Sequence, residues 1–428
     1  MNFGSPALLF LLAFSAQDDS SGTPVELLPH AELSAALRSL AEAHPDLVTH
    51  FEIGHSREGK SLDVLRFAGG EIEEGRPAIL LVANLDGPRV FASGVALHHA
   101  RRLAAEHGTN EEVKLLLDTT TVFVFARANP DAAEARFTSP RFERVAGGRG
   151  VDNDRDGRQG EDPPSDVNGD GLITTMRVPD PDGTWIEDPT EPRVLIEADA
   201  DKGQRGTWKL HTEGRDLDGD ERVAEDPPAD ARVNRNFSSG WGEHEADAGL
   251  FPTDEPEVRA LMDFVLQHDE LAMVLAYDEL DNLVKEPKSV KDDARSVKRV
   301  PPEGWLESDA KILAELGRRY AEATGSEAEG GKSDAGTFQR WCYDHRGLFT
   351  LSATLWELPQ EKLQGEEEEE DEGEGDDDEG EDEGEEGEED EDEAEKPKKK
   401  KEPKPSDDAK RLAWVDQNEG EDWRFVDW

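Results

Sequence analysis

The sequence predicts an α/β protein with a mixed, largely parallel central sheet flanked by helices. Two apolar runs, at 77–84 and 120–126, have the length and continuity of strands that are buried on both faces, which is typical of a parallel sheet. Segments with helical spacing of apolar residues alternate with the strand-like segments, as in repeated strand–helix–strand units. A long acidic loop insertion at about 146–231 and a disordered acidic tail are predicted to extend this domain.

Each element follows from its local pattern. In the first half, helical spacing predicts helices over 32–43 and 95–103, and alternation predicts strands over 48–54 and 62–67, joined by a turn at 56–61. In the second half, the patterns predict a helix over 259–266, a buried strand over 271–277, an amphipathic helix over 308–323 and a final strand over 348–356. The main domain is therefore expected to span about 23–360.

Charge dominates the composition. The 428 residues carry a formal net charge of −53, and 24 acidic residues lie between 366 and 395, so the rest of the chain is acidic as well. Such a field repels nucleic acid and anionic membranes and favours cations or basic partners. Residues 361–405 read as a disordered segment, first acidic and then basic, followed by a short aromatic segment at 406–428 that we expect to dock on an ordered part of the chain.

The N-terminus contains a short apolar run, from Pro6 to Ala16, that ends in small residues and is followed by Gln17-Asp18-Asp19. It is too short to span a bilayer and predicts a signal peptide over 1–16, hence export. No Lys or Arg precedes the run, and a buried N-terminal strand is the alternative. No transmembrane segment is predicted elsewhere. Cys342 is the only cysteine, so an internal disulfide is excluded.

Three similar acidic loops lie in the insertion. Each places oxygen-bearing side chains at alternate positions beside a glycine, which suits a hard cation such as Ca²⁺, and two of them have a Glu nine residues beyond their first Asp. The glutamate at position twelve of an EF-hand is missing, and solvated acidic turns are the alternative. The candidate calcium ligands are Asp152, Asp154, Asp156, Glu161, Asp166, Asn168, Asp170, Asp216, Asp218, Asp220 and Glu225.

The densest polar motif is Val233-Asn234-Arg235-Asn236-Phe237, which is followed by a helix start at Asp254-Glu255-Pro256-Glu257. An arginine offers two parallel donors that fit a carboxylate, and a neighbouring asparagine adds another donor. A surface turn is the alternative interpretation.

This motif resembles the Asn-Arg-Asn-Phe motif of the zinc metallocarboxypeptidases, the carboxypeptidase A-like family. The turn Ser56-Arg57-Glu58-Gly59-Lys60-Ser61 and the sequence Asn129-Pro130-Asp131 are similar to motifs of the same family. The resemblance covers about 56–356, apart from the insertion. It implies a carboxypeptidase-like fold, and a carboxylate-binding role for Asn234 and Arg235, where the family grips the C-terminus of a peptide.

The same resemblance places substitutions at the catalytic positions. The family would use one zinc ion, held by residues that correspond here to Asp86, Arg89 and Asp278, and Thr354 stands at the position of its catalytic glutamate. A guanidinium has no lone pair to offer a metal, so zinc binding is not expected. We expect Arg89 to form an ion pair with Asp86 or Asp278 instead. His98 and His99 are the possible replacement ligands.

The sequence therefore predicts a catalytically degenerate carboxypeptidase-like protein that binds a peptide C-terminus or another carboxylate without hydrolysing it. An active, secreted, zinc-dependent metallocarboxypeptidase with replacement ligands is one alternative. A calcium-stabilised surface scaffold protein is the second.

Overall fold

The computed structural model describes residues 25–70, 75–147, 158, 160–220, 222–224, 231–245, 247–285, 287–292, 304–326, 334–355 and 405–417. The predicted signal peptide, nearly all of the predicted low-complexity segment and the last aromatic residues lie outside these ranges. The chain divides into two compact units, one formed by residues 1–176 and 211–357 and the other by residues 177–210 and 358–428.

The first unit contains a six-stranded sheet with the strand order β1-β2-β4-β3-β11-β14. The pairs β1–β2 and β2–β4 are antiparallel, and the pairs β4–β3, β3–β11 and β11–β14 are parallel. This confirms the predicted mixed, largely parallel sheet. The strands are β1 (Val48–His55), β2 (Ser61–Phe67), β3 (Ala78–Ala83), β4 (Thr121–Phe125), β11 (Leu271–Tyr277) and β14 (Phe349–Ala353).

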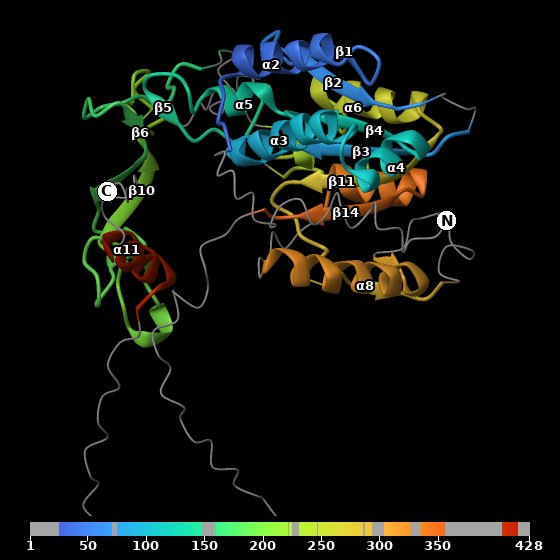
Figure 1. Cartoon of the computed structure of the whole chain (residues 1–428). Coiled ribbons are helices and arrows are strands. Elements are labelled where there is room, and N and C mark those ends of the chain that lie inside the picture. Colours follow the sequence, from blue (N-terminus) through green and yellow to red (C-terminus); the bar gives the residue numbers. More distant parts are fainter. Residues whose placement is uncertain are drawn as a thin grey trace, which may run out of the picture. The chain divides into compact units, whose positions relative to one another are not determined.

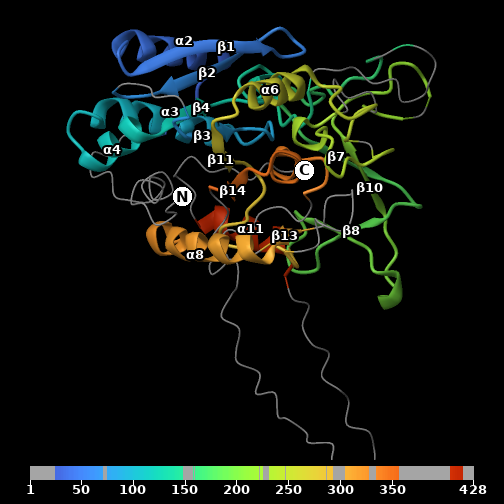
Figure 2. The same ribbon diagram turned by 90° about the vertical axis from the view of Figure 1, so that its right-hand side faces the viewer.

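Helices cover both faces of this sheet (Figures 1 and 2). The apolar residues of β3 alternate between two buried clusters: Leu81 packs with the helices of one face, and Leu80 with those of the other. The first face carries α2 (His30–Ala43), α3 (Val90–Glu106), α4 (Glu111–Thr119) and α8 (Glu307–Thr324). The second carries α6 (Pro256–Gln267) and the short α9 (Phe338–Trp341), which continues into a π-helical turn over Cys342–Arg346.

The predicted helices are present, with different ends. Helix α3 begins at Val90, five residues before the predicted start, and β14 ends at Ala353, three residues before the predicted end. Helix α4 is an addition to the predicted elements. Its start is fixed by Asn110, whose side chain accepts from the backbone N–H groups of Glu112 and Val113. None of the described helices has the length and apolar character that crossing a bilayer requires.

The insertion, which was predicted as a loop, contains regular secondary structure. It contributes a four-stranded sheet with the order β7-β10-β8-β9, most of which belongs to the second unit. Its strands are β7 (Thr175–Pro179), β8 (Trp185–Glu187), β9 (Leu195–Glu197) and β10 (Trp208–Thr212). The same unit contains α11 (Asp407–Gln417), which the sequence had suggested only as a docking segment.

Short elements complete the first unit. They are α5 (Pro130–Glu134), β5 (Arg141–Phe142), β6 (Leu172–Ile173), the 3₁₀ turn η2 (Val233–Arg235), β12 (Ser289–Val290) and β13 (Trp305–Leu306).

Candidate functional site

The parallel strands β3, β11 and β14 end side by side. Tyr277 pairs with Ala83 on one side and with Ala353 on the other, so the residues that follow all three strands meet at one edge of the sheet. Such an edge, at the carboxyl ends of parallel strands, is where ligands bind in open α/β sheets. The strand ends therefore bring together the positions that the sequence singled out, Asp86, Asp278 and Thr354.

Asp278 lies at the centre of this edge and is only 2% exposed. One carboxylate oxygen accepts from the backbone N–H of Asp86 at 2.9 Å, and the other accepts from the Asn234 side chain at 2.7 Å. Burial raises the pKa of Asp278 well above its usual value, and the negative charge of Asp86 acts in the same direction. The two donors oppose this shift by stabilising the ionised form.

Asp86 is bound by arginine on two sides. Arg89 Nε lies 3.6 Å from its carboxylate, so the expected ion pair is present. The closer partner is Arg232, whose Nη2 donates to Asp86 at 2.8 Å and to Glu279 at 2.7 Å. Burial raises the pKa of Asp86, although Arg232 opposes the shift, and the two carboxylates raise the pKa of Arg232 in spite of its own burial.

The residues at this edge do not fit a zinc ion. Arg89 cannot donate a lone pair, Asp86 is bound by Arg232, and both oxygens of Asp278 already accept hydrogen bonds. His99, the buried candidate replacement, instead packs edge-on against Tyr277, with Nδ1 3.4 Å from the hydroxyl. In the described part of the chain, the one group of three possible ligands within 4.8 Å of one another lies elsewhere, at Asp162, Asp216 and Asp218.

Thr354 is completely buried and makes structural hydrogen bonds. Its hydroxyl donates to the carbonyl oxygen of Glu279 at 3.0 Å, and its N–H donates to Asp281 at 3.2 Å. A threonine hydroxyl is a much weaker base than a carboxylate, so Thr354 cannot act as a general base near neutral pH.

The Asn-Arg-Asn motif forms η2 and holds two neighbouring segments. Asn234 accepts from the N–H of Phe338 at 2.9 Å while donating to Asp278, which fixes the start of α9 against the end of β11. Asn236 donates to the carbonyl oxygens of Ala248 and Phe251 at 2.7 and 2.9 Å. Both side chains are buried, and the hydrogen bonds of their amides join segments of the folded chain.

Arg235 is placed differently. Its side chain is 17% exposed, and Nη1 donates to the carbonyl oxygen of Ala335 at 3.2 Å. Gly336 lies so close that a Cβ would come within 2.2 Å of the Arg235 carbonyl oxygen, and its φ of +68° also favours glycine. Arg235 is thus held against the segment that enters α9.

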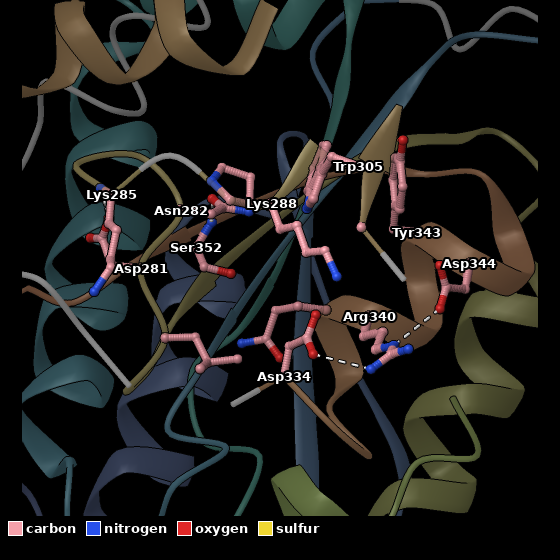
Figure 3. A pocket seen from close by; sticks show the side chains of 14 residues that line it. Asp281, Asn282, Lys285, Lys288, Trp305, Asp334, Arg340, Tyr343, Asp344 and Ser352 are labelled. Carbon is pink, nitrogen blue, oxygen red and sulfur yellow. Dashed lines mark hydrogen bonds and ion pairs between the residues drawn. The ribbon is translucent and has the colours of Figure 1, made fainter. Parts of the chain in front are cut away.

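That segment forms one wall of a cavity of about 500 Å³ (Figure 3). Figure 3 shows Asp281 and Lys285 on one side and Tyr343 and Asp344 on the other. The lining comprises Leu280, Asp281, Asn282, Lys285, Pro287, Lys288, Gly304, Trp305, Asp334, Gln339, Arg340, Tyr343, Asp344 and Ser352.

The acidic loops are described only in part. Asp152, Asp154, Asp156 and Glu225 lie outside the described residues. The loop at 166–171 is closed by its own hydrogen bonds, with Asp166 accepting from the N–H groups of Gly169 and Gly171. Asp216 and Asp218 lie near Asp162, which the sequence reasoning missed and which is fully buried, accepting from the N–H of Leu217. Calcium binding by these residues stays a prediction.

Sequence reasoning also missed Arg232, Glu279 and Gln339. Arg232 stands just before the Asn-Arg motif and Glu279 directly after Asp278, so both are next to residues that the sequence singled out, but no local pattern indicated that they pair. Gln339 carried no sequence signal.

Comparisons with known proteins agree with the fold. The family model described as zinc carboxypeptidase matches residues 33–372. Carboxypeptidase A2 of Mus musculus is 32% identical over 114 residues, which are 26% of each chain, and carboxypeptidase E of Caenorhabditis elegans is 33% identical over 134 residues, 29% of this chain and 28% of that protein. The matched region thus spans about a quarter of these curated relatives.

Among solved structures, bovine thrombin-activatable fibrinolysis inhibitor in complex with tick carboxypeptidase inhibitor is 16% identical, with a TM-score of 0.44 over 76% of this chain and 86% of that one. The family model covers well over half of the 428 residues and includes every strand of the six-stranded sheet. The chain belongs to the zinc carboxypeptidase family.

Proposed function

We propose that this protein is a non-catalytic member of its family that binds a peptide C-terminus, or a similar carboxylate, without hydrolysing it. The observation that carries the proposal is the guanidinium of Arg232, which bridges Asp86 and Glu279 at 2.8 and 2.7 Å beside the strand ends. This guanidinium supplies a fixed positive charge at the edge of the sheet where the family would hold its zinc ion.

Electrostatics supports this interpretation. A dication near Asp86 would meet the fixed charges of Arg232 and Arg89, and displacing Arg232 would leave its own partly buried charge uncompensated. Metal-assisted water activation needs a metal with an open position and a general base. Arg89 cannot hold a metal, and the hydroxyl of Thr354 is not a general base near neutral pH.

The carboxylate-binding role rests on Arg235. The Asn234 amide is engaged by Asp278 and Phe338, so we assign the ligand contact to the arginine and a positioning role to the asparagine. Arg235 contacts Ala335, next to Asp334 of the cavity wall, so a ligand carboxylate at the guanidinium would have the cavity within reach.

The test is a titration of peptides that differ only at their last group. Peptides with a free α-carboxylate should bind the full-length protein, while the same peptides with an amidated end should bind at least roughly tenfold more weakly. Arg235→Gln should abolish the difference, whereas Arg411→Gln on the exposed face of α11 should leave it unchanged. Equal affinity of both peptide forms would refute the proposal.

The alternative, a zinc-dependent carboxypeptidase, is tested in the same samples. Release of C-terminal amino acids that requires added zinc and stops with a chelator would favour the enzyme. Stoichiometric zinc in the purified protein, measured by elemental analysis, would do the same.

We also propose that the protein is exported and that its acidic run binds cations or basic proteins. A calcium-stabilised scaffold role is the second alternative function. The cluster of Asp162, Asp216 and Asp218 supports the calcium proposal, because it brings three carboxylate oxygens within 4.8 Å of one another, and carboxylates are ligands that Ca²⁺ prefers. Thermal unfolding with and without Ca²⁺, with Mg²⁺ as control, tests it; an unchanged midpoint would count against it.

A further inference from the structure

Two acidic loops of the insertion, at 166–171 and 216–220, share one pattern of hydrogen bonds. In each loop the first aspartate accepts from the N–H of the glycine three residues on, at 2.6 Å in both. The third side chain accepts from the N–H two residues on, at 2.8 Å for Asn168 and 2.9 Å for Asp218. The loops therefore differ in chemistry at this third position, where one has an amide and the other a carboxylate.

Buried carboxylates hold the backbone of both loops. Glu213 is 4% exposed, and its carboxylate accepts from three backbone N–H groups on the two sides of the first loop, including that of Asn168 at 3.2 Å. In the second loop, the N–H of Leu217 donates to the fully buried Asp162 at 2.8 Å. Because each loop is fixed from a neighbouring segment, its exposed tip keeps a defined backbone conformation.

The tip of the first loop contains the only Asn-Gly pair in the sequence, Asn168-Gly169. Both residues are exposed, and Gly169 has a φ of +79°. In such a pair the backbone nitrogen of the glycine can attack the side-chain carbonyl carbon of the asparagine, which closes a succinimide ring and releases ammonia. The attack is possible because glycine has no Cβ to block the close approach.

The groups that take part in this cyclisation already have hydrogen-bond partners. The attacking nitrogen, that of Gly169, donates to Asp166 Oδ1, which can accept its proton. The carbonyl oxygen of the Asn168 side chain accepts from the N–H of Asp170 at 2.8 Å, and the leaving amide nitrogen donates to the Asp170 carboxylate at 3.0 Å. A positioned proton acceptor and a donor at the oxygen that gains charge are the two elements that accelerate acyl transfer.

We propose that Asn168 is a site of spontaneous deamidation, and that the folded loop at 166–171 promotes the reaction. The nitrogen of Gly169 forms a bond to Cγ of Asn168 while its proton passes to Asp166. The Cγ–Nδ2 bond then breaks, and the nitrogen leaves as ammonia with that proton, which water relays. Water opens the succinimide at one of its two carbonyl groups and gives an aspartate or an isoaspartate.

The aspartate product gives the first loop the residue pattern of the second and adds a negative charge between Asp166 and Asp170. The modification therefore changes the charge of a loop that contains candidate calcium ligands. It does not depend on the proposed binding of a peptide C-terminus.

The test follows deamidation of the full-length protein by mass spectrometry of the peptide that contains residue 168, in buffer with a chelator. The reference is the same chain unfolded in urea at the same pH and temperature. The folded protein is expected to deamidate at least roughly tenfold faster, because a positioned proton acceptor accelerates a reaction by that much or more. Asp166→Ala should remove this advantage, whereas Asp201→Ala, at an exposed position of the insertion, should leave it unchanged.

Asp218→Asn is the second test, because it creates an Asn-Gly pair in the loop with the same hydrogen bonds. In the folded variant, the new amide at position 218 is expected to deamidate at a rate similar to that of Asn168. A rate for Asn168 that is no faster in the folded protein than in urea would overturn the proposal. An unchanged rate in Asp166→Ala, or a stable amide in Asp218→Asn, would do the same.

Discussion

Arg232 and Asp86 form a charge-assisted hydrogen bond of 2.8 Å that joins the segment before the Asn-Arg motif to the loop after β3. Because the same guanidinium also bonds Glu279, one cation holds two carboxylates that would otherwise repel each other. An ion pair that is shielded from water stabilises little by itself, but removing one partner leaves the other uncompensated. Arg232 is therefore the main counter-ion of both carboxylates, with Arg89 a more distant second partner of Asp86.

Arg232→Met should destabilise the protein by about 3–5 kcal/mol at neutral pH, because Asp86 and Glu279 lose their shared counter-ion. The loss should shrink in acid, because burial raises the pKa of Asp86 and so favours its protonated, uncharged form as the pH falls. Urea unfolding at pH 7 and pH 4 measures both values. Arg89→Met is the control: its side chain is 35% exposed and 3.6 Å from Asp86, so its cost should stay below about 1 kcal/mol. An equal cost for both variants would contradict the assignment.

Asn234→Ala should destabilise the protein by about 1–3 kcal/mol, because Asp278 and the Phe338 N–H both lose a buried partner. Denaturant unfolding gives the value. Asn234→Asp is the informative second variant, since it keeps an acceptor for Phe338 but places a second carboxylate against Asp278. We expect it to be the more destabilising of the two at pH 7 and to recover in acid; a pH-independent cost would argue against a charge conflict.

Glu257 should make stability depend on pH. Its carboxylate is 2% exposed and Oε2 has no hydrogen-bond partner among the described residues. Burial, with the negative charges of Asp131 and Glu255, raises the pKa of Glu257 from 4.5 to about 7. The folded protein therefore holds the proton more tightly than the unfolded chain.

The stability that this proton gives is fully present below pH 4.5 and is lost as the pH rises through 7, amounting to about 3 kcal/mol for a shift of this size. Glu257→Gln should remove that slope between pH 5 and 8 and leave the protein more stable than wild type at pH 8. Chemical unfolding across this range measures it, and an unchanged slope in the variant would rule the residue out as its source.

The sequence predicted the sheet because its central strands are continuous apolar runs and its first two strands alternate apolar and polar residues. It identified Asp86, Asp278 and Thr354 as neighbours through the family resemblance, and the parallel strand ends bring these positions together. The sequence could not predict which arginine is the closer ion-pair partner of Asp86. Whether it is Arg89 or Arg232 depends on where η2 packs, and no local sequence pattern encodes that packing. The same holds for Gln339, whose buried amide has no hydrogen-bond partner among the described residues.

Helix α11 should remain attached to the second unit when the acidic run is cut. The N–H of Ser406 donates to Asp188 at 3.2 Å, Arg193 pairs with Asp416 at 2.6 Å, and Leu412 is 2% exposed. Burial alone would raise the pKa of Asp188, but hydrogen bonds from Ser406 and Thr190 outweigh it and lower the pKa to about 2. Helix α11 therefore has contacts of its own with the insertion, in addition to its covalent connection through the acidic run.

A protease site introduced within 365–395 should yield two fragments that co-elute in gel filtration at neutral pH. Leu412→Asp should release the C-terminal fragment, because it places a charge in the buried contact, whereas Arg411→Asp, at an exposed position of the same helix, should not. Asp188→Asn should weaken retention, since the amide accepts less strongly from Ser406. Spontaneous separation of the cleaved wild-type fragments would show that α11 is held only by its covalent connection.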